Sequence, residues 1–277
     1  MEFDRTTRRR LSALDREGAD PAAPLVTSPS RPPGVRLVGD PEELHGALDE
    51  LLPGVVRELD EGELYELTMP VAALGDWAAE AYRTWEQASR DGRFPGAAHP
   101  ARNVPPEQVV FFDTETTALS NAPLFLVGAL ALGEEGPVIR QLLARDYAEE
   151  PAVLAEARRL LHAADLAVSY NGNSFDLPYL RDRLRYHRLG PLHVRGHLDL
   201  LPVARRRLGR SLGNCKLQTL ELHLCRRRRG HDIAGEHIPQ AYHDFVADGD
   251  AWQMRRIIEH NAYDIVTLAE LAVRLTD

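Results

Sequence analysis

The chain has little cysteine and no long apolar run. Only two of its 277 residues are cysteines, Cys215 and Cys225, too few for the disulfide framework of a small secreted protein, so we expect a reducing, cytoplasmic environment. The first dozen residues, MEFDRTTRRRLS, lack the apolar centre of a signal peptide. The longest apolar run, 124–132, is too short to cross a bilayer. No membrane partner is therefore expected.

The scarcity of cysteine also limits zinc chemistry. A zinc site would have to combine Cys215, His223, Cys225 and His231, and the spacing of these four residues matches no usual zinc-finger pattern. The acidic residues are the better candidates for metal ligands.

Basic residues are outnumbered, with 33 Lys and Arg against 42 Asp and Glu and a net charge of −9. An acid excess argues against a nucleic-acid partner, because phosphate binding depends on Lys and Arg. The charge is uneven, however: residues 40–63 hold nine acids and one base, whereas residues 195–230 hold ten bases and two acids. The basic region is either an electrostatic footprint for a polyanion or a solvated basic surface.

Two acids directly follow a short apolar stretch in VVFFDTETT, residues 109–117. Residues 109–112 are too few for a helix and rich in strand formers, which predicts a buried strand. Because strand side chains alternate between faces, Asp113 and Glu115 share one face. Two carboxylates this close favour a divalent cation as partner, since like charges otherwise push one of them toward its protonated form. A solvated loop after the strand is the alternative.

Three regions follow from composition. Residues 1–34 lack periodicity and predict a mobile leader. Residues 35–104 form an N-terminal extension that we expect to be mainly helical: Asp40 caps a helix in DPEELHGALDELL, ELYELTMPVAAL is a strand or extended piece, and a helical stretch carries Trp77, Tyr82 and Trp85. A linker rich in Pro and Gly precedes a core domain at 105–277.

The core alternates strands and helices. Short connections between strands at 109–112, 124–132 and 138–144 predict an antiparallel meander. A helix at 151–164, a buried strand at 166–170 and a helix at 175–187 then predict an α/β fold with a mixed sheet. A possible strand at 197–200 and helices at 198–208, 217–224 and 250–275 complete the core. The last helix carries His260 and Asp264 one turn apart.

Three short motifs resemble those of the DEDD superfamily of 3′-to-5′ exonucleases: FDTETT, NGNSFD and HNAYD. They contribute four acids, Asp113, Glu115, Asp176 and Asp264. A longer succession, SYNGNSFDLPYL, HLDLL, CKLQTLE, DIAGEHIPQAY and HNAYDIVTL, resembles the YprB-type ribonuclease-H-like family from Val109 to Leu271. The resemblance implies a ribonuclease-H-like mixed sheet, an antiparallel meander plus parallel strands, flanked by helices.

The resemblance also implies a two-metal nuclease. Asp113 would bridge two Mg²⁺ or Mn²⁺ ions, Glu115 and Asp264 would complete one of them, and Asp176 would hold the other. Both are hard ions that prefer carboxylate and water oxygens, and a pair of them roughly 3.5–4 Å apart stabilises an in-line displacement at phosphorus. The implied substrate is nucleic acid, DNA or RNA, with a single-stranded 3′ end.

His260 departs from the better-known DEDD patterns. One branch has a tyrosine four residues before its last Asp and the other a histidine five residues before, whereas this chain has His260 four residues before Asp264. His260 is placed to orient or deprotonate the attacking water, and its near-neutral intrinsic pKa suits that role. The adjacent Tyr263 lies about 100° away around the helix and does not replace it. A histidine paired with a carboxylate is the structural alternative.

Further positions match those that contact substrate in the family. Thr116, Thr117 and Leu119 would line the terminal nucleotide, Asn171 and Phe175 would shape the second motif, and Lys216 would contact phosphate. Arg205, Arg206 and the run 226–229 are further phosphate candidates. An endonuclease, or a nucleic-acid-binding module without turnover, remains an alternative to the exonuclease.

Overall fold

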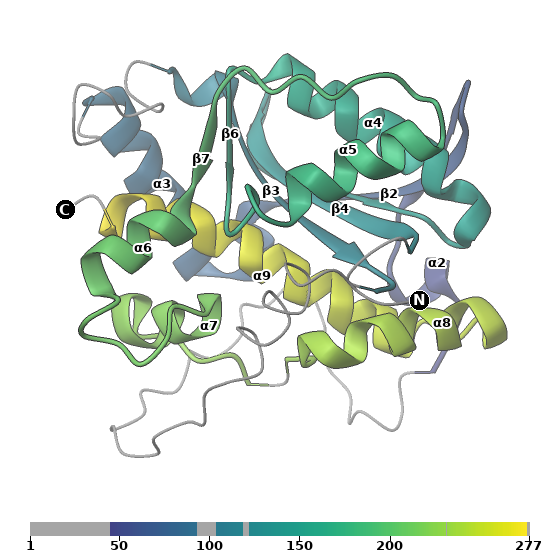
Figure 1. The fold of residues 1–277 in the computed structure, drawn as a ribbon. Helices are drawn as coiled ribbons and strands as arrows, with labels where there is room; N and C mark the ends of the chain where they lie inside the picture. Colours follow the sequence, from purple (N-terminus) through teal and green to yellow (C-terminus); the bar gives the residue numbers. More distant parts are fainter. Residues whose placement is uncertain (1–44, 93–103, 119–121, 231, 276–277) are drawn as a thin grey trace, which may run out of the picture.

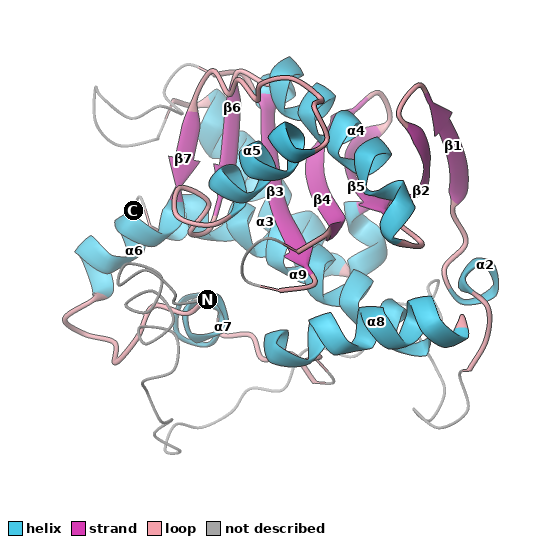
Figure 2. Ribbon diagram, turned by 45° about the vertical axis from the view of Figure 1, so that its right-hand side comes forward, coloured by secondary structure: helices cyan, strands magenta, loops and turns pink. Residues whose placement is uncertain are grey.

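A seven-stranded mixed sheet forms the centre of the protein. The computed structural model describes residues 45–92, 104–118, 122–230 and 232–275, and its strand order is β1-β2-β5-β4-β3-β6-β7 (Figure 2). The first five strands in this order, β1-β2-β5-β4-β3, are antiparallel to their neighbours. Strand β6 is parallel to β3, and β7 is parallel to β6. The strands are β1 Val55–Leu59, β2 Gly62–Pro70, β3 Val109–Thr116, β4 Leu124–Gly133, β5 Gly136–Leu143, β6 Leu166–Ser169 and β7 His197–Asp199.

Helices cover both faces of this sheet. Helices α4 and α5 lie on one face, and α3 and the long α9 lie on the other (Figures 1 and 2). The helices are α2 Leu48–Leu51, α3 Asp76–Arg90, α4 Glu150–Ala163, α5 Asp176–Tyr186, α6 Leu200–Leu208, α7 Leu217–Leu220, α8 Ile238–Asp248 and α9 Trp252–Arg274. A π-helical turn, Glu221–Cys225, continues α7.

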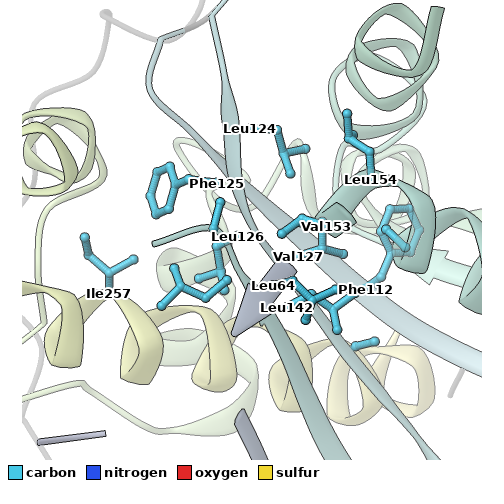
Figure 3. Close-up of a cluster of buried hydrophobic side chains, with 14 of the residues drawn as sticks. Leu64, Phe112, Leu124, Phe125, Leu126, Val127, Leu142, Val153, Leu154 and Ile257 are labelled. Atoms are coloured by element: carbon cyan, nitrogen blue, oxygen red, sulfur yellow. The ribbon is translucent and has the colours of Figure 1, made fainter. Parts of the chain in front are cut away.

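Strand β3 is buried on both faces in its first half, which fixes the position of Asp113 and Glu115 in its second half. Phe112 packs in the cluster between the sheet and α4 (Figure 3). Phe111 faces the opposite cluster and meets the Trp85 ring edge-on, with ring centroids 4.8 Å apart. Burying each of these rings stabilises the fold by about 1.5–3 kcal/mol. The packing of Phe111 and Phe112 therefore holds the neighbouring Asp113 in place within the strand.

The core elements agree with the sequence predictions. The meander β3-β4-β5 and the parallel strand β6 confirm the mixed sheet, and α9 confirms the last helix. Helix α8 was not predicted. Among the helices in the described part of the chain, α9 included, none combines the length and the apolar content that crossing a bilayer requires.

The N-terminal extension is built into the same sheet. Its strand β2 pairs with β5, and β1 adds an edge strand that was not predicted. Helix α3 packs on α9, where the Trp77 ring stacks on Tyr263 at 5.3 Å. The helix expected from Asp40 is reduced, in the described residues, to the single turn α2, and residues 45–47 are not helical. Asp40 and the leader 1–34 lie outside the described residues, and the boundary near residue 105 stays a prediction.

Candidate active site

The end of β3 presents acids toward α9 and a threonine toward α5. Asp113 accepts a hydrogen bond from Asn261 Nδ2 at 3.0 Å on the α9 side. On the α5 side, Thr114 Oγ1 donates to Asp176 Oδ1 at 2.6 Å. The β3–β4 register shifts between Glu115 and Thr116, and such a bulge bends a strand and redirects its side chains.

Asp176 begins α5 and is 3% exposed. A carboxylate is favoured in the first turn of a helix, where unpaired backbone N–H groups point outward. The loop before it is clamped by Asp199, whose two carboxylate oxygens accept from the backbone N–H groups of Asn171 and Asn173 at 2.8 and 3.1 Å. Asp199 also caps α6 by accepting from Leu201 N at 3.0 Å. Asp199 therefore supports the second motif and caps α6.

Helix α9 brings His260 and Asp264 to the same place. His260 Nδ1 lies 2.7 Å from Asp232 Oδ1, and His260 Nε2 lies 3.5 Å from Asp264 Oδ2. Arg229 donates to Asp264 and, at 2.8 Å, to Glu221. One segment, Glu221 to Asp232, thus supplies an arginine and two acids that hold the last motif.

The acids of the three motifs repel one another. Burial raises the pKa of Asp113 well above its usual value, and Asp264 and Glu115 raise it further. Burial also raises the pKa of Glu115, to about 8, although His260 opposes the rise. The pKa of Asp176 rises to about 6 for the same reason, against the opposing hydrogen bond from Thr114. Asp113, Glu115, Asp176 and Asp264 therefore form one electrostatic unit, called here the acid cluster.

The acid cluster fits a hard divalent cation by its donor chemistry. Its candidate ligands are all carboxylates, and the pKa values of Asp113, Glu115 and Asp176 are raised by burial, with neighbouring acids adding to the rise at Asp113 and Glu115. Mg²⁺ and Mn²⁺ prefer such oxygen donors. The cluster is not preassembled: in the described ranges, no three Asp, Glu, His or Cys side chains already stand as a metal-binding group.

The acids around His260 favour its protonated form. Burial alone would lower its pKa, but Asp264 and Asp232 outweigh burial and raise the pKa to about 9. This differs from the near-neutral titration expected from the sequence. A protonated imidazole has no free lone pair with which to accept a proton, so His260 here is a counter-ion of Asp264 and Glu115.

Comparison with known proteins places this geometry in a family. The sequence profile of the RNase H superfamily matches residues 110–276, more than half of the chain. The chain belongs to the RNase H superfamily.

A curated relative, the uncharacterized protein YprB of Bacillus subtilis strain 168, is 31% identical over 173 residues. The alignment covers 60% of this chain and 41% of that protein, so the chain spans well under half the length of the relative. A solved structure of the family B DNA polymerase from the archaeon Pyrobaculum calidifontis is similar with a TM-score of 0.48 at 18% identity. That match covers 62% of this chain and 25% of the polymerase.

The residues predicted to contact substrate have different structural environments. Thr116 Oγ1 donates to Ala118 O at 2.9 Å and Thr117 Oγ1 to Pro123 O at 3.1 Å, so both hydroxyl groups are used within the turn after β3. Asn171 has a positive φ of 65° and acts as a turn former. Phe175 is half-buried beside Tyr179. Leu119 lies outside the described residues.

The phosphate candidates divide into exposed and buried groups. Lys216, Arg205 and Arg206 are exposed, as a phosphate contact requires. Arg227 and Arg229 are instead buried in ion pairs: Arg227 Nη1 lies 2.8 Å from Glu270, and its guanidinium lies 3.7 Å from the centroid of the Trp77 ring. The hypothesis that the whole run 226–229 is a phosphate track is therefore wrong for these two residues.

Tyr263 does not face the acid cluster as a substitute for His260. Its ring stacks on Trp77, and the Arg229 guanidinium lies 5.5 Å from the ring centroid. The zinc alternative gains no support: Cys215 and Cys225 are free thiols, and His231 lies outside the described residues.

Glu221, Asp232 and Asn261 were not predicted as site residues, and Arg229 was predicted only as a phosphate contact. Two signals were available. Asn261 directly follows His260 in HNAYD, and Asp232 opens the DIAGEHIPQAY segment. Neither residue type distinguishes a site residue from a helix or turn residue without the contact partners, which come from other parts of the chain.

Proposed function

We propose that this chain is a metal-dependent nuclease that hydrolyses phosphodiester bonds from the 3′ end of single-stranded nucleic acid. The observation that carries the proposal is the acid cluster on β3, α5 and α9: burial raises the pKa of Asp113, Glu115 and Asp176, and neighbouring acids raise the pKa of Asp113 and Glu115 further. Membership of the RNase H superfamily supports nuclease chemistry. Strongly perturbed acids that converge at one place are typical of catalytic sites.

The acid cluster would hold two Mg²⁺ or Mn²⁺ ions, with Asp113 shared between them. When bound, such ions supply charge stabilisation for the attacking and leaving oxygens of an in-line displacement. The protein's own part is positional. Thr114 holds Asp176, Arg229 holds Asp264, and Asn261 holds Asp113.

His260 would orient the attacking water. Its ring is fixed by Asp232 on one nitrogen, so the other nitrogen is directed toward Asp264. His260 can accept a proton only when the carboxylates that raise its pKa are neutralised. This condition links proton transfer to a loaded acid cluster.

The substrate would be a polyanion. Three of the exposed basic residues in the region 195–230, Arg205, Arg206 and Lys216, suit contacts with the phosphate backbone. The proposal leaves DNA and RNA as alternatives, since 2′-hydroxyl contacts decide between them.

The test is digestion of end-labelled oligonucleotides by the purified full chain. In Mn²⁺ or Mg²⁺, a 5′-labelled single strand should shorten stepwise while a 3′-labelled strand releases labelled mononucleotide at once. Asp113→Asn should reduce the rate by about 10³-fold or more, comparable with the loss of a principal electrostatic group. EDTA should stop the reaction.

Asp182→Asn is the matched control, because Asp182 lies on the same helix as Asp176 and its side chain is 69% exposed. It should digest at the wild-type rate. Cleavage of a circular single strand would replace the exonuclease by an endonuclease. Metal-independent binding without product, unchanged by Asp113→Asn, would replace both by a non-catalytic nucleic-acid-binding module.

A further inference from the structure

Three residues form a row across the sheet beside the acid cluster. Asp113 on β3 is the cross-strand partner of Gly128 on β4, and Gly128 is the partner of Gln141 on β5. Neighbours in such a row point their side chains to the same face. The row therefore consists of the carboxylate of Asp113, the glycine Gly128 without a side chain, and the amide of Gln141.

Helix α9 fills the gap with Asn261. A Cβ atom added to Gly128 would lie 1.9 Å from Asn261 Oδ1 and 2.3 Å from Ile265 Cδ1, so position 128 has room for a hydrogen atom and nothing larger. Glycine weakens a strand interior and often marks a close approach of another element. Here the element that approaches is the helix that carries the third acid motif.

The amide of Asn261 has one possible orientation. Gln141 Nε2 donates to Ile258 O at 2.8 Å and to Asn261 Oδ1 at 3.0 Å. Because a backbone carbonyl only accepts, Gln141 must direct its NH₂ group to α9, and Asn261 must then present its oxygen to Gln141. Asn261 Nδ2 is left to donate to Asp113 Oδ2 at 3.0 Å. Gln141 and Asn261 are both fully buried.

This chain of amides costs stability. The NH₂ group of Gln141 is hydrogen-bonded, but its side-chain oxygen, Oε1, is buried without a hydrogen-bond partner in the described structure. A buried unsatisfied acceptor is rare in native proteins and calls for an explanation. Apolar side chains at 141 and 261 would fill the same space without that cost, so packing alone does not explain the two amides.

We propose that Asn261 is the positioning residue for Asp113, and that Gly128 and Gln141 exist in this row to seat and orient it. The amide occupies Oδ2 of Asp113 with a neutral donor and turns Oδ1 toward the cation of the acid cluster. A neutral donor fixes the carboxylate without adding a positive charge that would repel the cation. The inference rests on the proposed metal-dependent function and adds a residue that acts through Asp113.

The test is Mn²⁺ binding to the full chain, measured by isothermal titration calorimetry. Asn261→Leu removes the donor but keeps the approximate size and the neutrality of the side chain. We expect Mn²⁺ affinity to fall by about tenfold or more, as for other groups that orient metal ligands. Gln141→Met should lower affinity in the same direction by a smaller factor, because Asn261 still reaches Asp113.

Ile265→Val is the matched control, since Ile265 packs in the same slot over Gly128 and loses no polar atom. It should bind Mn²⁺ as the wild type does. In an Asp113→Asn background, Asn261→Leu should cause little further loss, because the two residues act as one unit. Circular dichroism of each variant verifies that it is folded.

The outcomes separate this inference from the proposed function. If Asp113→Asn leaves Mn²⁺ affinity unchanged, the metal site and this inference both fall. If Asp113→Asn weakens binding but Asn261→Leu does not, or if Ile265→Val weakens it equally, Asn261 has no positioning role. If Asn261→Leu does not fold, the Mn²⁺ affinity of Gln141→Met tests the proposal instead. A wild-type affinity for Gln141→Met would then overturn the proposal.

Discussion

Two groups of buried acids in this protein have opposite electrostatics. On the face that carries α4, Glu66 and Glu156 both accept from Arg57 and Arg140 at 2.5–2.9 Å. Burial would raise the pKa of each of these glutamates, but the two arginines lower it below its usual value. We call this the four-residue ion network. In the acid cluster, burial and like charges raise the pKa instead.

The difference lies in charge balance: arginines compensate the acids of one group, whereas the other keeps an excess of negative charge, as the proposed metal site requires. The four-residue ion network joins β1, β2, β5 and α4 and balances two acids with two bases. The acid cluster has no such balance within the described residues: there, Arg229 and His260 contact Asp264, while Asp113 accepts a hydrogen bond from an amide alone. A protein tolerates such an excess of negative charge where a cation is meant to bind.

Arg229 is the arginine that pairs with an acid of the acid cluster, Asp264, and its removal should have the largest effect on stability. Its side chain is 6% exposed and pairs with Glu221, Asp232 and Asp264. Arg229→Met should lower the free energy of unfolding by about 3–5 kcal/mol, because it leaves buried carboxylates uncompensated. Urea unfolding in EDTA measures the change.

Arg226→Met is the control for this prediction, because Arg226 is exposed in the same run of arginines. Its effect should stay within about 0.5 kcal/mol, as for most surface substitutions. Equal losses for the two variants would mean that the pairing of Arg229 with the acid cluster has no special energetic weight.

Opposite stability changes should distinguish one acid of each group. Glu66→Gln should destabilise the protein by about 1–3 kcal/mol, since it weakens two hydrogen bonds to charged groups. Glu115→Gln removes a like charge from the acid cluster and should leave the metal-free protein at least as stable as the wild type. Thermal unfolding in EDTA compares both variants with the wild type.

The comparison fails if both glutamine variants lose stability to the same extent. It also fails if added Mn²⁺ stabilises Glu115→Gln as much as it stabilises the wild type, because only a protein that binds the ion gains stability from it. Glu66→Gln, which lies outside the acid cluster, should keep the wild-type response to Mn²⁺.

The sequence predicted the elements that are buried by their own composition. The apolar stretches that became β3, β4 and β6 are continuous, as expected for strands covered on both faces. The apolar stripe of α9 is long and periodic. The four acids followed from short motifs next to these elements, so their positions along the chain were predictable.

The support around the acids was not predictable, because it depends on pairing between distant segments. A run of four arginines is typical of a solvated surface, and only contact with Glu221, Asp264 and Glu270 buries two of them. Strand β1 was missed for a similar reason. Its Val55 side chain is 64% exposed, so the strand exists through backbone pairing with β2 rather than through an apolar pattern.

The pH dependence of stability should have opposite signs in the two groups. Glu66 and Glu156 have lowered pKa values, so their contribution is present above the unfolded pKa of about 4.5 and is lost as the pH falls below it. Glu115 has a raised pKa of about 8, so the folded protein binds more protons than the unfolded chain between pH 4.5 and 8, and stability falls as the pH rises through that window. His260, with its pKa raised to about 9, adds a loss of the same sign between pH 6.5 and 9.

Urea unfolding in EDTA at pH 5 to 9 should therefore show declining stability, and Glu115→Gln should flatten the decline below pH 8. A wild-type curve that rises over this range would mean that the carboxylates of the acid cluster are compensated in the metal-free protein, like those of the four-residue ion network.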